Sequence, residues 1–232
     1  MLMKRDHQEI DEGGGYIGYR QARQIIENHI QPLEEETAVL NQCAGRILAA
    51  DLAAMQAWLT SLSLPNRTSI VADSEKTTSE ELEKQWPYAD AILTSGGAWG
   101  SQRDLIVGAM NRLGWHKLFH YVRMGPGKGV AFGLWRNRPF FCLPGGPSSN
   151  HMAFLQLALP ALSRMGGDTE RPLPTVMAKL IEDVNGRHRA WTEFKDAVVA
   201  IDGEGHYTVG LYRTSSRLQA IARANALIYS GR

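Results

Sequence analysis

Two short glycine-rich segments carry the residues best suited to chemistry in this sequence. Each follows a run of apolar residues and precedes a segment with helical periodicity. They consist of Thr94, Ser95, Gly96 and Gly97, and of Pro144, Gly145, Gly146, Pro147, Ser148 and Ser149. Glycine lets a backbone approach a phosphate closely, and the N–H groups that begin a helix stabilise an anion without a lysine. The pattern therefore predicts a site for a phosphorylated small molecule.

Glycine and proline also turn a chain without binding anything, and for one such segment this is the commoner role. Two segments, both containing Ser or Thr, favour binding. In an open parallel sheet, ligands bind beyond the carboxyl ends of the strands. We therefore expect both segments to lie at one edge of a sheet.

Lys128 lies between these segments in sequence, in a loop of small residues that spans positions 124–129. Its ammonium group could contact a phosphate or another oxyanion, although a solvated lysine in a turn explains the residue equally well. The loop is not a nucleotide-binding Walker A motif, because it lacks that glycine spacing and a Ser or Thr after the lysine.

Asp73 and Asp104 follow predicted strands, so both are expected at the same edge as the glycine segments. Two carboxylates there could hold Mg²⁺ between phosphates, although an Asp more often serves as a helix N-terminal charge. Ser148, Ser149 and His151 also cluster, but the G-x-S-x-G elbow of serine hydrolases is absent. Acyl transfer is therefore disfavoured, and His151 is expected to be an ordinary helix residue.

Alternating helices and strands must position these residues, which predicts an α/β fold with a largely parallel sheet in three layers. A small β domain follows, and a helical segment precedes. Helices are predicted at 19–30, 55–64, 78–86, 104–113 and 148–165, the last kinked by Pro160. Strands are predicted at 69–72, 91–94, 117–123, 130–135 and 139–143, and β-rich runs at 176–182, 191–201, 207–211 and 226–229. Thr78 and Glu81 have the spacing of a capping box.

The predicted organisation has four parts. Residues 1–18 form a disordered leader, 19–54 a helical segment, 55–168 the α/β domain and 169–232 the C-terminal β domain. The formal net charge of +1 offers no global field for nucleic acid or an anionic membrane. Cys43 and Cys142 lack zinc-ligand spacing. No apolar run approaches the length of a membrane span, so a cytoplasmic protein with reduced thiols is expected.

Several motifs in fixed order resemble one known family. The stretches TSGG at 94–97, PGKG at 126–129 with AFG at 131–133, and LPGGP at 143–147 are similar to the molybdopterin-binding domain of MoeA and the gephyrin E domain. The flanks agree, since LNQCAGRILAADL at 40–52 resembles the MoeA amino-terminal segment. RTSSRLQAIARANALIYSGR at 213–232 is similar to its C-terminal β domain.

The resemblance implies molybdenum cofactor biosynthesis, with insertion of molybdate into adenylylated molybdopterin, release of AMP and assistance from Mg²⁺. It implies a cytoplasmic homodimer, or pairing with another molybdenum cofactor protein. Residues 94–97 and 144–149 would then bind the pterin and its phosphate, Asp104 and Lys128 would act in catalysis, and Asp73 and Asp104 would hold the metal. Molybdenum and tungsten remain alternatives.

The chain also departs from the family pattern. It lacks the S-x-M-D-G-Y-A loop and a first sheet strand with acidic residues, and Gly125 and Gly146 replace a Lys and an Asn of the family motifs. A non-catalytic molybdopterin carrier or sensor is therefore the alternative. Loss of the strand is expected to leave a sheet edge that the N-terminal segment or a partner covers.

Overall fold

The structure of the protein is a computed structural model that describes residues 15–33, 47–49, 53–71, 74–96, 105–168, 172–186, 190–215 and 217–230. The leader expected at 1–18 therefore lies mostly outside the described residues. So do Asp73, Gly97 and Asp104, together with residues 34–46.

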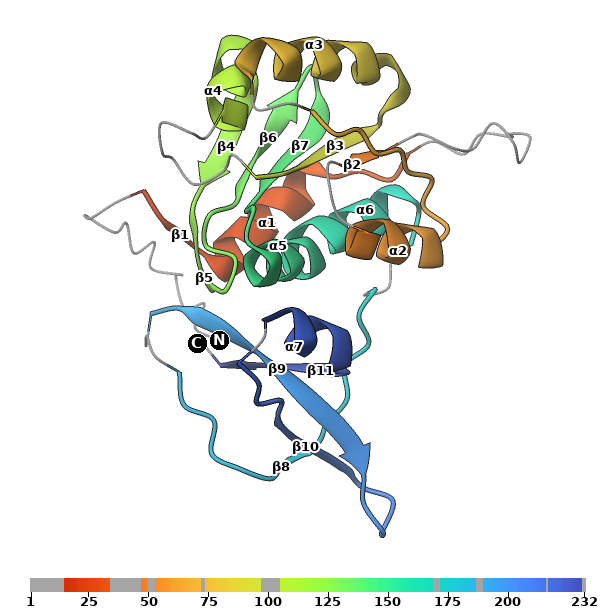
Figure 1. Ribbon diagram of the computed structural model, residues 1–232, viewed down its shortest axis with the longest axis vertical. Helices are drawn as coiled ribbons and strands as arrows, with labels where there is room; N and C mark the ends of the chain where they lie inside the picture. The colour runs from red at the N-terminus through yellow and green to blue at the C-terminus, as the bar shows by residue number, and fades with distance from the viewer. Residues whose placement is uncertain are drawn as a thin grey trace, which may run out of the picture.

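The first sheet has the strand order β2-β3-β7-β6-β4 (Figure 1). Its strands are β2 (Ile47–Ala49), β3 (Ala91–Ser95), β4 (His116–His120), β6 (Ala131–Trp135) and β7 (Arg138–Leu143). β2, β3 and β7 pair in parallel, whereas β7, β6 and β4 pair antiparallel. The sheet is therefore mixed, and its parallel half contains the two strands that precede the glycine segments.

Helices cover both faces of this sheet, which confirms the three-layer α/β prediction (Figure 1). Ile92, Phe140 and Cys142 pack in one core with α3 (Glu75–Gln85) and α4 (Leu105–Arg112). Leu93, Phe141 and Leu143 belong to the other core, because alternate residues of a strand face opposite sides. The helices of that second face are α1 (Tyr19–His29), α2 (Ala53–Ser61), α5 (Pro147–Ala153) and α6 (Leu159–Met165).

The predicted long helix at 148–165 is continuous but not uniform. A π-helical segment, η3 (Phe154–Ala158), separates α5 from α6. Pro160 stands in the first turn of α6. Proline has no N–H to donate to the preceding turn and clashes with it, so a wider turn accommodates the ring.

The second sheet has the order β1-β5-β9-β10-β8, with β11 also paired to β9. Its elements are β1 (Ile17–Gly18), β5 (Val122–Gly125), β8 (Lys179–Leu180), β9 (Thr192–Ile201), β10 (Tyr207–Leu211) and β11 (Ala226–Ser230), with helix α7 (Arg217–Arg223) beside them. The chain leaves the first sheet at Tyr121, whose φ is 72°, and enters the second as β5. The C-terminal β structure is therefore present, and β5 extends it with residues from the middle of the chain.

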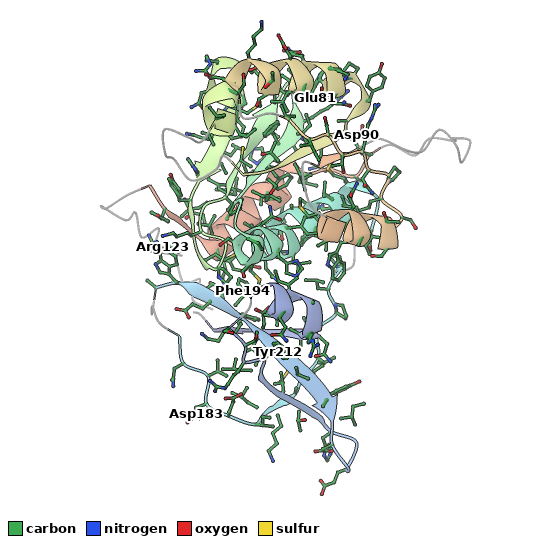
Figure 2. All side chains as sticks on the ribbon, in the orientation of Figure 1. Glu81, Asp90, Arg123, Asp183, Phe194 and Tyr212 are labelled. Carbon is green, nitrogen blue, oxygen red and sulfur yellow. The ribbon has the colours of Figure 1, made fainter. Side chains whose placement is uncertain are left out.

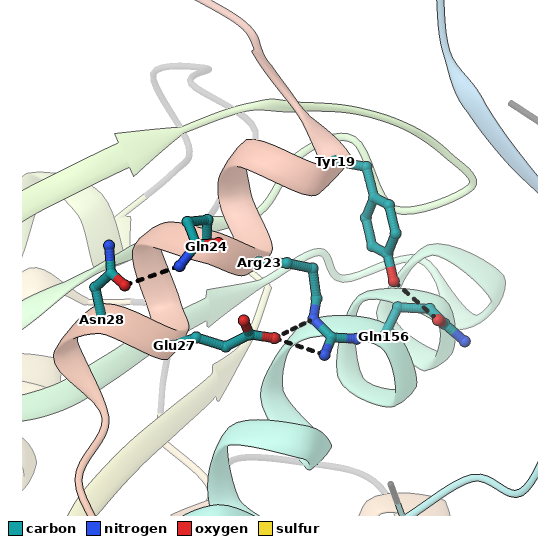
Figure 3. A network of polar contacts seen from close by, with 6 residues as sticks. All are labelled: Tyr19, Arg23, Gln24, Glu27, Asn28 and Gln156. Atoms are coloured by element: carbon teal, nitrogen blue, oxygen red, sulfur yellow. Dashed lines mark hydrogen bonds and ion pairs between the residues drawn. The ribbon is translucent and has the colours of Figure 1, made fainter. Parts of the chain in front are cut away.

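An apolar junction joins the two sheets. Phe194 of β9, labelled in Figure 2, belongs to the same core as α1 and α5, and its ring lies 5.3 Å from that of Tyr19. The Tyr19 hydroxyl donates to Gln156 Oε1 at 3.2 Å, and Arg23 pairs with Glu27 at 2.8 Å beside it (Figure 3). α1 therefore binds the π-helical segment and the second sheet at once.

The structure differs from the sequence-based elements in several places. β1 lies at the end of the segment expected to be a disordered leader, and the helix α7 was not predicted. Residues 47–49 form β2 on the edge of β3, inside the segment expected to be helical, so the chain's own N-terminal part covers that edge. Residues 69–71 form no strand, and Ile70 is 89% exposed. α3 begins at Glu75, so Thr78 lies within the helix and is not its cap. The strand expected at 117–123 is broken at Tyr121.

Candidate functional site

The two glycine segments meet at one edge of the first sheet. Ser95 and Leu143 are partners in the parallel pairing of β3 and β7, and Gly96 N–H donates to Leu143 O at 3.0 Å. A methyl group on Gly145 would lie 3.2 Å from Gly96 Cα. We call residues 95–96 the β3 turn and residues 144–146 the β7 turn. Their contact confirms the predicted proximity of the two segments.

Asn150 joins the two turns, and the sequence analysis did not single it out. Its side chain is fully buried, and its Nδ2 donates to Ser95 Oγ at 3.0 Å and to Pro144 O at 2.9 Å. A carbonyl oxygen only accepts hydrogen bonds, so the amide nitrogen must face Pro144. In the sequence Asn150 is one of several polar residues in the first turns of the predicted helix, so nothing distinguished it.

Asn150 Oδ1 is buried and accepts no hydrogen bond from the described residues. A buried acceptor without a partner costs about 1–3 kcal/mol. Nearly all buried polar atoms have a partner, so an exception needs an explanation, such as a functional role or an ordered water. Asn150 therefore marks this edge as more than a packing contact.

The described residues of the first glycine segment, Thr94 to Gly96, have different surroundings. Thr94 is buried, and its hydroxyl donates to Phe141 O at 3.4 Å within the sheet. Ser95 and Gly96 are half-buried at the strand end, and the φ of +92° at Gly96 favours glycine. Because Gly96 N–H is bonded to Leu143, Ser95 supplies the remaining donor of the described β3 turn.

Backbone N–H groups dominate the other side of the site. The first helical hydrogen bond of α5 runs from Asn150 N to Gly146 O at 2.8 Å. The N–H groups of Ser148 and Ser149 precede it, and the first N–H groups of a helix have no partner within the helix. Pro147 has no N–H to offer. The β7 turn and the start of α5 therefore present unused donors next to Ser95.

The loop of Lys128 packs on the flank of α5. Gly127 has a φ of +112°, and a methyl group there would lie 3.3 Å from Ser149 O and 3.4 Å from Ala153 N. Only glycine allows this approach. Lys128 Nζ lies 5.9 Å from the centre of the Trp191 ring, which places its charge toward the second sheet.

His151 interacts electrostatically with Asp196 of β9 in the second sheet. Burial lowers the pKa of His151, and the nearby Asp196 carboxylate partly opposes this. Burial raises the pKa of Asp196, and His151 partly opposes that shift. His151 belongs to α5, as expected, and the hydrolase interpretation gains no support.

The described residues contain no cluster of three or more His, Cys, Asp or Glu side chains that could hold a metal ion. Asp73 and Asp104 lie outside those residues, so their pairing stays a prediction. Within the same described ranges, no helix combines the length and apolar character needed to cross a membrane.

Comparisons with known proteins agree with this geometry. Residues 34–164, more than half of the chain, match the family model described as a probable molybdopterin binding domain. The Drosophila melanogaster molybdenum cofactor synthesis protein cinnamon is 31% identical over 165 residues, which are 69% of this chain and 27% of that protein. Gephyrin from Dictyostelium discoideum is 26% identical, over 70% of this chain and 26% of its own length. The chain thus spans about a quarter of these two relatives.

Two solved structures share the fold. A molybdenum cofactor biosynthesis protein from Pyrococcus furiosus superposes with a TM-score of 0.69 at 17% identity and covers 93% of both chains. The molybdopterin biosynthesis MoeA protein from Pyrococcus horikosii gives 0.60 at 19% identity, over 79% of this chain and 49% of that one. By the matching family model and these relatives, the chain belongs to the molybdopterin-binding domain family that includes MoeA and gephyrin.

Proposed function

We propose that the protein binds molybdopterin or its adenylylated form and acts in molybdenum cofactor biosynthesis. The observation that supports this most strongly is the contact between the β3 and β7 turns, which Asn150 fixes through two hydrogen bonds. Family membership supplies the class of ligand, and the unused donors at this edge suit a phosphate.

The geometry suits an anion in a protein of nearly neutral charge. Ser95 Oγ and the N–H groups of Ser148 and Ser149 are short-range donors that lie on adjacent segments. Fixed dipoles bind an oxyanion without a lysine at the point of contact. Lys128, turned toward Trp191, would then contribute through longer-range attraction.

The finer proposal is molybdate insertion into adenylylated molybdopterin, with Asp104 and Lys128 as the acting residues. Mg²⁺ would neutralise phosphate charge, and Asp73 and Asp104 would hold it, since paired carboxylates are the ligands Mg²⁺ prefers.

A binding titration tests the proposal. Calorimetry with molybdopterin and with adenylylated molybdopterin, each with and without Mg²⁺, should show binding by the wild-type protein. Asp104→Ala should abolish the metal dependence, and Lys128→Met should weaken binding. Lys179→Met is the matched control, because Lys179 is an exposed lysine of β8. Absence of binding to either form would refute the proposal.

An activity assay distinguishes the two hypotheses, an enzyme and a non-catalytic carrier or sensor. The missing loop and strand of the family pattern favour the carrier or sensor. Molybdate should release AMP from the bound adenylylated ligand if the protein is a transferase. A carrier would bind the same ligand and leave it intact. Light scattering of the purified protein, alone and with a full-length relative, tests the proposed homodimer and the alternative pairing.

A further inference from the structure

We infer that Asn150 is a positioning residue that directs the hydroxyl hydrogen of Ser95 away from itself and toward an oxyanion. This inference rests on the proposed function and adds the direction of one hydrogen bond to it. The bonding pattern of Asn150, Ser95 and Pro144 supports it.

The first step concerns the amide of Asn150. Nδ2 carries two hydrogens, and Pro144 O at 2.9 Å and Ser95 Oγ at 3.0 Å account for both. A rotated amide would set Oδ1 against the carbonyl oxygen of Pro144, and two acceptors repel each other. The orientation is therefore fixed by the backbone.

The second step concerns the Ser95 hydroxyl. It accepts the hydrogen bond from Asn150, so its own hydrogen must point elsewhere. Among the described residues Ser95 Oγ has no second partner, and the residue is half-buried at the strand end. The hydroxyl hydrogen is therefore available to an acceptor atom of a ligand, such as a phosphate oxygen.

The third step concerns the buried Oδ1 of Asn150. It has no partner among the described residues, although the side chain is fully buried. The two hydrogen bonds that Nδ2 donates, to Ser95 and to Pro144, offset the cost of this unpaired acceptor. Asn150 thus connects the two turns and directs the hydroxyl hydrogen of Ser95.

The ligand group predicted here is a fully ionised phosphate monoester, which presents only acceptors. Its second ionisation has a pKa near 6, so binding by the wild-type protein should strengthen between about pH 5 and 7.5. A bound sugar hydroxyl or neutral amide would show no such dependence. The pH profile distinguishes this role from one that only holds the fold.

The experiment titrates molybdopterin into the wild-type protein, Ser95→Ala, Ser95→Thr and Asn150→Asp at several pH values. Ser95→Ala should weaken binding roughly tenfold or more and flatten the pH profile, because a hydrogen bond to a charged group is lost. Ser95→Thr keeps the hydroxyl and should restore most of the affinity. Asn150→Asp should weaken binding further, since the carboxylate cannot donate and attracts the Ser95 hydrogen to itself.

Asn66→Asp is the matched control. Asn66 Nδ2 also donates to a backbone oxygen, that of Leu64 at 3.1 Å, in the segment that follows α2. It should bind as the wild type does. Circular dichroism shows whether each variant folds, and the Ser95 pair decides the result if Asn150→Asp does not.

Failures of the two proposals look different. Wild-type protein that binds no molybdopterin overturns both. Wild-type binding that Ser95→Ala and Asn150→Asp leave unchanged overturns only the assignment of Ser95 and Asn150.

Discussion

The parallel half and the antiparallel half of the first sheet differ in what lies at the ends of their strands. In the parallel half, β3 and β7 end at one edge, where small and polar residues meet. In the antiparallel half, β6 and β7 form a hairpin, and its turn at Arg136 and Asn137 has positive φ at both residues. Parallel pairing leaves loops at a shared edge, whereas a hairpin consumes its loop in a tight turn.

Polar residues in the antiparallel half serve packing. Arg138 Nη1 donates to Trp86 O at 2.7 Å and to Ala89 O at 2.8 Å, and Trp135 Nε1 donates to Leu113 O at 3.2 Å. No described polar group there matches the unpaired Oδ1 of Asn150. The comparison therefore predicts that stability and ligand binding can be changed separately.

The largest effect on stability should come from Trp135→Ala. Trp135 is fully buried and its ring centre lies 4.7 Å from that of Trp86, so the cavity should cost about 3–5 kcal/mol of unfolding free energy. Affinity per folded molecule should stay unchanged. Chemical denaturation and calorimetry at low temperature measure the two quantities. Trp58→Ala, on half-buried Trp58, should cost less. Equal losses would contradict the assigned core.

Arg138→Ala should have the next largest effect. It leaves two backbone carbonyls without their donor and removes a guanidinium 4.6 Å from the Trp86 ring centre. A loss of about 2–3 kcal/mol is expected in denaturant unfolding. Arg136→Ala is the comparison, because its pair with Glu83 at 2.6 Å is exposed and should contribute at most about 1 kcal/mol. The reverse ranking would be evidence against this interpretation.

Gly145→Ala should change binding more than stability. Its methyl group would press on Gly96 Cα at 3.2 Å and separate the turns, so molybdopterin affinity should fall roughly tenfold. The expected cost in stability is about 1 kcal/mol. Gly203→Ala is the matched control, because no atom lies within 4 Å of its methyl position and Gly203 is exposed in the turn between β9 and β10. Equal affinities for both variants would argue against the contact.

The smallest expected effect is on the pH dependence of stability, to which His151 of α5 contributes. The pKa of His151 is lowered in the folded state, chiefly by burial. Below pH 6.5 the unfolded state therefore binds the proton more readily, and stability falls as pH falls through that value. His151→Gln should remove this part of the pH dependence between pH 7.5 and 5.5 in denaturant titrations. An unchanged pH profile would show that His151 is not buried as described.

Much of this architecture could be predicted from the sequence, because strong local patterns fixed it. The apolar runs of β3 and β7 and the helical period of residues 19–30 required no knowledge of distant contacts. The proximity of the two turns followed from the rule for parallel strands. The roles of the predicted site residues, including Asp73, Asp104 and Lys128, stay predictions.

The remainder depended on tertiary contacts. β2 has only three residues and exists because β3 offers it an open edge. Residues 69–71 looked like a strand by composition but lack a neighbour, and Ser69 donates instead to Glu81 at 2.8 Å. Asn150 could not be recognised, since its importance comes from Ser95, which lies 55 residues earlier.

The position of β5 has a consequence for synthesis. β5 lies between β1 and β9 in the second sheet, although β9 belongs to the last quarter of the chain (Figure 1). In a growing polypeptide that has emerged only to residue 168, β5 can therefore pair with β1 but not yet with β9. Completion of that sheet must wait for the ribosome to deliver β9, so the part of the protein that precedes it stays locally unfinished until residues 192–201 have been made.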